Sequence, residues 1–329
     1  MRVVVDAFGG DNAPLEVLKG CSLALNENYS DLIKILIVGD KEKIRRVAFE
    51  NNIDITKLHI IDAPQTITME DDADVVIDSK KQSSMAKGLE CLTNGEGDVF
   101  ISGGNSGALV VGCTFIVKRI KGIKRCAFAP IIPGAKKPFM LIDAGANVEC
   151  RPSMLVQFGI MGSLYMKKIM KVENPKVALA NIGTEECKGR SLQKEAFERL
   201  KVAPVNFTGN IEAREIPSSS ADVVVTDGFT GNVILKVYEG TARVFMNKIK
   251  DILNKNFKNK IAALAILDDL KEIKKQTCQE EYAGSPVLGA SRPVFKVHGN
   301  SKAKSFKNAI HLAVSYVNTN ITEEIFSKI

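Results

Sequence analysis

Short runs of β-branched and other apolar residues alternate along this chain with stretches in which apolar residues recur every three or four positions. Continuous apolar runs are typical of parallel strands buried on both faces, and the longer period is typical of the helices that cover them. The pattern predicts an α/β fold with a Rossmann-like, mostly parallel sheet and helices on both faces. No internal repeat or Pro-rich linker interrupts the 329 residues, so we expect one α/β domain over residues 1–329.

Six of the apolar runs end in loops rich in glycine and small polar residues. These loops span residues 6–11, 102–107, 143–147, 181–185, 226–232 and 298–301. Glycine in any one of them commonly serves only a tight turn. In a parallel sheet, however, all such loops emerge at the carboxyl ends of the strands, where ligands bind. We therefore expect the six loops to converge on one cleft for a polar ligand.

Residues 241–281 follow a different pattern. Apolar positions keep helical spacing, and between Lys248 and Lys275 eight lysines stand against four acidic residues. We interpret the segment as a projecting pair of amphipathic helices with a break near Lys258–Lys260. The pair either packs on the core or at a dimer interface, or it is a basic element whose apolar tip touches lipid. The residues of that tip would be Ile261, Leu264, Ile266 and Leu267.

The amino-acid composition limits the kinds of partner that we expect this protein to bind. The 45 basic and 38 acidic residues give a net charge of +7, which suits an acidic partner, an anionic substrate or a membrane surface. Aromatic residues make up 6% of the chain and there is no Trp, so we expect no nucleic-acid partner. The seven cysteines are scattered without a CxxC pair, which indicates free thiols in a reducing compartment.

Other features point to a cytoplasmic protein without a metal site. No two of the three histidines have the spacing of metal ligands. The first residues reach Asp6 after three apolar positions, so we expect no signal-peptide core. The longest apolar run, residues 108–117, is about half of a membrane span.

The loops favour anion binding over covalent catalysis. The chain has no GxSxG elbow and no P-loop, and Gly103-Gly104-x-x-Gly107 departs from the dinucleotide-binding fingerprint. Loops that lead into helix N-termini offer free backbone N–H groups to phosphate. Lys188 lies in a loop flanked by glycines, and Asn232 is either a helix N-cap or an amide donor to a substrate.

At these loops the sequence resembles the phosphate acyltransferases of bacterial phospholipid synthesis, the PlsX family, over essentially the whole chain. The matching segments are Asp6–Pro14, Lys81–Met85, Ser102–Leu109, Asp143–Val148, Leu155–Phe158, Asn181–Glu186, Gly209–Glu212, Asp227–Asn232 and His298–Ser301. The sequence departs from the family at four positions. Phe8 and Asn12 replace the usual Met and His, Gln82 replaces Asp, and Asn300 replaces Ser.

The resemblance implies an enzyme that moves a fatty acyl group from acyl carrier protein to inorganic phosphate. Its product, an acyl phosphate, feeds glycerol-3-phosphate acylation. The family fold is similar to that of phosphotransacetylase and of the isocitrate and isopropylmalate dehydrogenases. The resemblance also implies a homodimer that associates peripherally with the membrane, and a reaction without a cofactor.

Residue roles follow from this reaction. We hypothesise that Lys188 and Asn232 stabilise developing charge, and that His298 either assists departure of the thiolate or is structural. The residues expected to bind phosphate or substrate are Asp6, Gly9, Gly10, Asp11, Ser83, Ser84, Gly104, Asn105, Ser106, Asn147, Thr184, Asp227 and Ser301.

Three alternatives remain open from the residues. A phosphotransacetylase-like enzyme would use coenzyme A esters in the same chemistry. An NAD-dependent decarboxylating dehydrogenase would need metal-binding carboxylates, for which Asp143, Asp222 and Asp227 are available. A non-enzymatic scaffold on a lipid surface would act through residues 249–273 and would leave the six loops unexplained.

Overall fold

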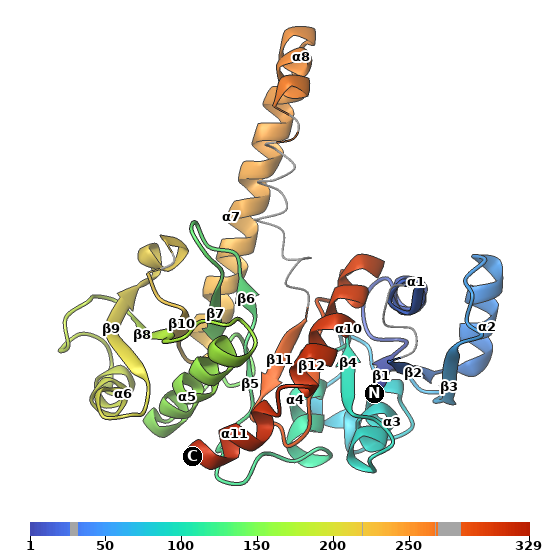
Figure 1. Ribbon diagram of the computed structural model, residues 1–329, viewed down its shortest axis with the longest axis horizontal. Coiled ribbons are helices and arrows are strands. Elements are labelled where there is room, and N and C mark those ends of the chain that lie inside the picture. Colours follow the sequence, from blue (N-terminus) through green and yellow to red (C-terminus); the bar gives the residue numbers. More distant parts are fainter. Residues whose placement is uncertain (27–31, 219, 267, 269–283) are drawn as a thin grey trace.

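The computed structural model describes residues 1–26, 32–218, 220–266, 268 and 284–329. In this part of the chain the strands form two sheets with helices on both sides (Figure 1). The first sheet has, in spatial order, β3 (Leu58–Asp62), β2 (Lys34–Gly39), β1 (Arg2–Asp6), β4 (Val99–Ser102), β12 (Val294–Lys296), β11 (Ser285–Leu288) and β5 (Ala127–Phe128). The second sheet has β6 (Ile131–Ile132), β7 (Phe139–Ile142), β10 (Val223–Val225), β8 (Lys176–Asn181) and β9 (Asn206–Glu212).

The helices connect these strands and extend beyond them. They are α1 (Leu15–Asn26), α2 (Lys41–Glu50), α3 (Ser84–Thr93), α4 (Ser106–Phe115), α5 (Pro152–Lys168), α6 (Ser191–Lys201), α7 (Gly228–Asn254), α8 (Phe257–Ala265), α10 (Ala303–Val317) and α11 (Ile321–Lys328). Two short 3₁₀ helices, η1 and η2, cover Ala73–Val76 and Ala213–Ser218.

Most strand pairs are parallel, which confirms the predicted α/β class. In the first sheet β3, β2, β1, β4 and β12 are parallel, and β11 is antiparallel to both of its neighbours. In the second sheet β7, β10, β8 and β9 are parallel, and β6 is antiparallel to β7.

The chain passes from the first sheet to the second at Pro130, and it returns to the first sheet at β11. The N–H of Ala129 donates to Pro286 of the first sheet, whereas the carbonyl of Pro130 accepts from Leu141 of the second. A proline has no N–H with which to continue a ladder, so the pairing of β5 ends here and that of β6 begins in the other sheet.

Alternate strand residues belong to two hydrophobic clusters, one on each face of the sheets. Val3 and Val5 belong to one cluster and Val4 to the other, and residues of β10 alternate in the same way. Each cluster contains residues of both sheets. This packing explains why the strands are continuously apolar rather than alternating with polar residues.

Polar residues of the predicted loops begin several helices. The side chains of Ser83, Asn105 and Asp227 are the N-caps of α3, α4 and α7, and each accepts a hydrogen bond from a backbone N–H three residues later. Such caps stabilise helices by about 1 kcal/mol each. The N-termini of α4 and α7 lie at the carboxyl ends of β4 and β10, because these helices follow those strands directly in the chain.

Helices α7 and α8 stand out from the body of the molecule (Figure 1). Helix α7 has 27 residues and is therefore about 40 Å long, and its buried residues are only Gly228 and Gly231. The predicted break near residues 258–260 is wrong by about one helical turn. The chain leaves the helix at Lys255 and Asn256 because the Asn256 side chain accepts from the N–H of Asn259 and caps α8 instead.

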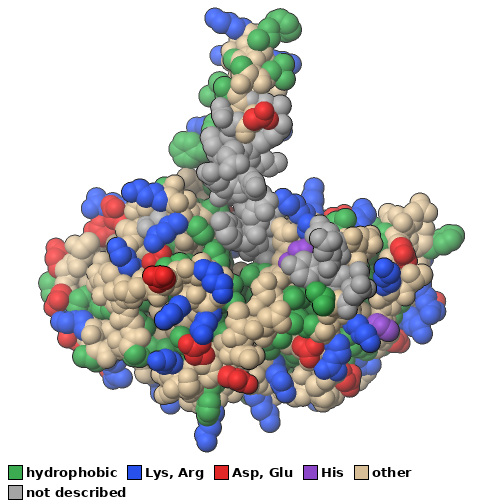
Figure 2. All heavy atoms as spheres, in the orientation of Figure 1, with side chains coloured by type: hydrophobic (Ala, Val, Ile, Leu, Met, Phe, Trp, Pro, Cys, Tyr) green, Lys and Arg blue, Asp and Glu red, His purple; other side chains and the backbone are tan. Residues whose placement is uncertain are grey.

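The end of this protrusion carries apolar and basic side chains together (Figure 2). The exposed fractions are 53% for Ile261, 71% for Leu264 and 42% for Ile266. Leu267, the fourth predicted tip residue, lies outside the described residues. Within the described ranges, no helix has both the length and the apolar character needed to cross a membrane. The six cysteines in these ranges are free thiols, as predicted.

Candidate active site

A cavity of about 1070 Å³ lies at the junction of the two sheets, beside Phe128–Ile131. Five of the six predicted loops contribute to its lining, through Asp11, Ser106, Ala144, Asn232 and the segment His298–Ser301. The sixth loop, which follows β8, lies outside the lining. In the second sheet β8 is one strand further from the junction than β10, so its loop emerges farther from the cavity.

The cavity has an apolar wall and a polar wall. Its apolar lining includes Phe128, Ile131, Leu235, Phe245 and Met246, which come from the sheet junction and from α7. Hydroxyl and amide groups face the same space from the loops after β4, β10 and β12. A substrate with an apolar chain and a polar reacting end would match both walls.

Basic side chains outnumber acidic ones around the cavity. The basic lining residues are Lys236, Arg243, Lys296 and Lys302, and the acidic ones are Asp11 and Glu239. His298 Nε2 lies 3.4 Å from Lys236 Nζ and 3.8 Å from Glu239 Oε2. This predicted catalytic histidine therefore lines the cavity beside two charged residues of α7.

Asn232 lies in the second turn of α7 and lines the cavity. Its side chain packs beside Gly145 of the β7 loop, where a Cβ atom would lie 3.6 Å from it. The alternative role as an N-cap is wrong, because Asp227 caps α7 and accepts from the N–H of Thr230 at 2.8 Å. Asn232 is thus an exposed amide at the candidate site.

Four other predicted binding residues lie outside the lining, namely Asp6, Gly9, Gly10 and Gly104. The buried Asp6 carboxylate accepts from Ser102 Oγ at 2.7 Å and from the N–H of Phe8 at 3.1 Å. The Gly104 N–H donates in turn to Ser102 Oγ at 3.0 Å. Burial raises the pKa of Asp6, against the effect of these hydrogen bonds. This network supports the loops that border the cavity.

The predicted residues Ser83, Ser84 and Asn105 are also outside the lining and have structural partners. Ser83 Oγ accepts from the N–H of Ala86 at 3.2 Å, and the buried Ser84 hydroxyl interacts with Asp6. Asn105 Oδ1 accepts from the N–H of Ala108, and its amide donates to two carbonyl oxygens of the segment before η1. These three side chains therefore form hydrogen bonds within the protein rather than facing the cavity.

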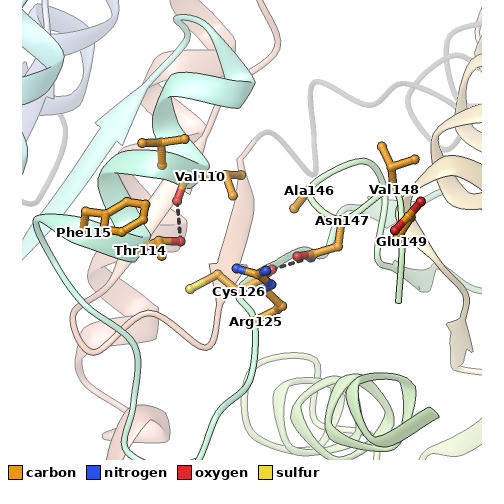
Figure 3. A pocket seen from close by; sticks show the side chains of 10 residues that line it. Val110, Thr114, Phe115, Arg125, Cys126, Ala146, Asn147, Val148 and Glu149 are labelled. Atoms are coloured by element: carbon orange, nitrogen blue, oxygen red, sulfur yellow. Dashed lines mark hydrogen bonds between the residues drawn. The ribbon is translucent and has the colours of Figure 1, made fainter. Parts of the chain in front are cut away.

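Asn147 lies beside a second, smaller cavity of about 290 Å³ (Figure 3). Its amide donates to the carbonyl of Cys126 at 2.7 Å and to the buried Asp143 carboxylate at 2.8 Å. Burial raises the pKa of Asp143, although four backbone N–H groups also donate to it. The hydrogen bonds of Asp143 and Asn147 therefore stabilise the conformation of the loop after β7.

The loop after β8 is exposed and holds the predicted residues Thr184 and Lys188. Its connection to the candidate site is the ion pair between Arg190 and Asp227, at 3.1 Å. Asp227 begins α7, five residues before Asn232. The loop is thus joined to the helix that carries the amide at the cavity, while the Lys188 side chain lies outside the cavity lining.

Two departures from the family pattern have structural explanations. The Asn12 amide donates to the carbonyls of Asn300 and Ser301, at 3.1 and 3.4 Å. It joins the loop after β1 to the loop after β12. The Phe8 ring packs beside Gly39 at the end of β2.

Sequence reasoning missed the charged groups that α7 and β12 bring to the cavity, above all Lys236, Glu239 and Lys296. A lysine at the end of an otherwise apolar strand was the available signal for Lys296, because ligands bind at the carboxyl ends of parallel strands. The residues of α7 gave no signal because their face depends on how the helix leaves the sheet.

The carboxylates required by the dehydrogenase alternative do not come together. Asp143 accepts from its own loop, Asp222 pairs with Lys137 at 2.5 Å, and Asp227 caps α7. Among the described residues, no group of three acidic, histidine or cysteine side chains has the arrangement of a metal site.

Comparisons with known proteins agree with this arrangement. The model of the family described as fatty acid synthesis protein matches residues 1–324. The phosphate acyltransferase of Acetivibrio thermocellus is 45% identical over 325 residues, which cover 99% of this chain and 95% of that protein. The phosphate acyltransferase of Clostridium novyi is 43% identical over 329 residues, which cover 100% of this chain and 98% of that protein.

Solved structures show the same fold at low identity. A phosphotransacetylase from Streptococcus pyogenes has a TM-score of 0.64 at 15% identity, covering 96% of this chain and 94% of that one. The EutD phosphotransacetylase from Staphylococcus aureus has a TM-score of 0.61 at 16% identity, with the same coverage. The relatives named above are phosphate acyltransferases, and the chain belongs to the fatty acid synthesis protein family.

Proposed function

We propose that this protein transfers a fatty acyl group from acyl carrier protein to inorganic phosphate. The observation that carries the proposal is the cavity at the sheet junction, where an apolar wall meets polar loops and basic side chains. The apolar wall suits an acyl chain, and the polar loops suit phosphate. The naming of the relatives as phosphate acyltransferases supports the same chemistry.

The reaction needs little from the protein beyond position and charge. A phosphate oxygen attacks the thioester carbonyl carbon, the new C–O bond forms, and the C–S bond breaks. The proton that hydrogen phosphate loses ends on the departing thiolate. A thiol with a pKa of about 8.5 leaves readily, so the main task is to hold phosphate in line and to stabilise the developing oxyanion.

Three residues take the electrostatic roles in this proposal. Asn232 donates its amide to the oxyanion or to phosphate from the cavity wall, and His298 assists the thiolate from the neighbouring loop. Lys188 stabilises charge from the loop after β8, which must approach the cavity for this purpose. Ser106, Ser301 and Asp11 complete the polar lining that receives the substrates.

The protrusion supplies the remaining contacts in the proposal. The exposed apolar residues Ile261 and Leu264 at its tip touch a membrane surface, and exposed Val237 and Val244 on α7 contribute to a homodimer. The excess of basic residues speeds encounter with the acidic carrier protein. Flotation with anionic phospholipid vesicles tests the membrane contact, and light scattering tests the dimer.

The deciding experiment measures free thiol released from a long-chain acyl carrier protein, with and without inorganic phosphate. The matching acyl coenzyme A runs in parallel. Phosphate-dependent release from the carrier protein supports the proposal. Release from coenzyme A esters alone would replace it with a phosphotransacetylase-like activity, and absence of release from both would favour the lipid-surface scaffold.

A further inference from the structure

Lys296 is a basic residue at the end of an otherwise apolar strand, outside the site that the sequence predicts. It is the last residue of β12 and pairs in register with Ser102 of β4. It lines the large cavity, as do Ser106 and His298. The side chain therefore extends from the sheet toward the place where the substrates of the proposed reaction meet.

The ammonium of Lys296 is held by backbone carbonyls. Its Nζ donates to the carbonyl oxygens of Gly103 at 2.8 Å and of Gly104 at 2.5 Å. An ammonium has three N–H donors, so one remains after these two bonds. Among the described residues, no third acceptor and no carboxylate within 4.0 Å engages this nitrogen.

The charged groups around Lys296 do not neutralise it directly. Asp6 and Asp11, from β1 and its loop, favour the charged form at longer range, and Lys236 on α7 opposes it. His298, Glu239 and Lys302 are the other titratable groups of the lining on this side. Burial is the largest influence and lowers the pKa of Lys296 to about 8, because an ammonium removed from water without a counterion is costly.

We propose that Lys296 binds the substrate phosphate through its remaining N–H while its other two N–H groups hold the Gly103–Gly104 turn. A phosphate oxygen in the cavity would supply both the missing acceptor and the missing counterion. The turn leads through Asn105 into α4, whose N-terminal residue Ser106 lines the same cavity, so the helix dipole also favours an anion there. This inference rests on the proposed function, because it assigns a binding residue to its phosphate.

The test uses the full-length variants Lys296→Met and Lys296→Arg, assayed by thiol release across phosphate concentration and pH. In Lys296→Met the phosphate KM rises by about tenfold to a hundredfold, the range for a lost hydrogen bond to a charged group, while the thioester KM changes less than twofold. Lys87→Met is the matched control, since Lys87 also donates to a backbone carbonyl, of Asp62, but lies outside the cavity lining.

The pH profile separates a phosphate contact from a merely structural one. In the wild type the phosphate KM rises above a pH of about 8, because Lys296 loses its proton and its charge. In Lys296→Arg the guanidinium keeps its charge throughout this range, and the alkaline rise is flattened. Thermal unfolding with and without inorganic phosphate provides a readout that does not depend on turnover.

A Lys296→Met enzyme with an unchanged phosphate KM, or a Lys296→Arg enzyme with the full alkaline rise, would overturn the inference and leave the proposed function intact. The opposite case is a wild type that releases no thiol but is stabilised by phosphate, with the stabilisation lost in Lys296→Met. That result would overturn the proposed function and leave the phosphate contact of Lys296 intact. A wild type with neither phosphate-dependent release nor phosphate-dependent stabilisation would overturn both.

Discussion

The loops of the first sheet and the loop after β8 in the second sheet have similar sequences and opposite environments. In the first sheet the backbone of one loop contacts the backbone of the next, as where the N–H of Asp11 donates to the carbonyl of Gly299 at 2.8 Å. The β8 loop is bonded mainly to itself and to β9, and its Lys188 and Thr184 are exposed. Glycine and small polar residues therefore serve close packing in one region and open access in the other.

The two regions therefore differ in how they could contact a substrate. Interlocked loops hold their backbone N–H groups in place before a substrate arrives, which is what preorganised anion binding requires. The exposed β8 loop presents its side chains to solvent and is joined to α7 by the ion pair between Arg190 and Asp227.

Removal of either of two of the three proposed electrostatic side chains, Asn232 and Lys188, should lower turnover most. We expect Asn232→Ala and Lys188→Ala each to reduce kcat by about a hundredfold to a thousandfold, the range for loss of one donor to an oxyanion. Both side chains are exposed, so the free energy of unfolding should change by less than about 0.5 kcal/mol. Steady-state kinetics and thermal unfolding measure the two effects, with exposed Lys194→Ala as the control.

Wild-type turnover in Lys188→Ala would show that the β8 loop contributes no charge to the reaction. A large loss in that variant would instead mean that the loop reaches the cavity during turnover, because Lys188 lies outside the cavity lining here.

A methyl group added to each region should distinguish them next. A Cβ at Gly9 would lie 2.7 Å from both Asp6 Oδ2 and the Gly104 nitrogen, which are fixed by the loop network. We expect Gly9→Ala to destabilise the fold by about 1–3 kcal/mol, as overpacking does. At Gly183 the nearest atoms belong to the side chains of Glu185 and Lys188, which can move, so Gly183→Ala should be close to neutral.

Denaturant unfolding measures both glycine variants. Equal losses of stability would contradict the contrast, because they would mean that the β8 loop is packed as tightly as the loops of the first sheet.

The ion pair that joins the β8 loop to α7 should have the smallest effect. Arg190 is 70% exposed, so its attraction to the buried Asp227 is screened by solvent. We expect Arg190→Gln to change stability by less than about 1 kcal/mol and to lower kcat by up to about fivefold, through looser placement of the loop. A double-mutant cycle with Lys188→Ala checks the mechanism, since non-additive losses would show that Arg190 acts through that loop.

The elements were predictable because each depends on neighbours in the sequence. Valine runs such as Val3–Val5 predict buried strands, and loops such as 102–107 predict turns into helices, since both signals are local. The break after α7 was misplaced because a single asparagine such as Asn256 is a weak sequence signal for a cap. The helical spacing of the apolar residues around it is the stronger signal. The two sheets were missed because Pro130 changes the partner of the chain without interrupting its apolar pattern.

The candidate site was predictable only in part. Asn232, His298 and Ser301 line one cavity, although Asn232 follows β10 of the second sheet and the other two follow β12 of the first. Ser83, Asn105 and Asp227 have the residue types of both caps and ligands, and sequence alone could not separate these roles. Lys296 was missed because its two acceptors, at Gly103 and Gly104, are nearly 200 residues away in the chain.

The α/β class, the family and the loops that could meet a ligand follow from the amino-acid sequence alone, because periodicity, turn chemistry and ordered motifs are local properties of the chain. The packing of the folded chain settles which loop residues are caps, which line the cavity, and which lysine is held by backbone carbonyls without a carboxylate of the described residues in ion-pair distance. Those properties depend on distances between strands that are remote in sequence, and on how much water the packing of both sheets and α7 leaves around each charge.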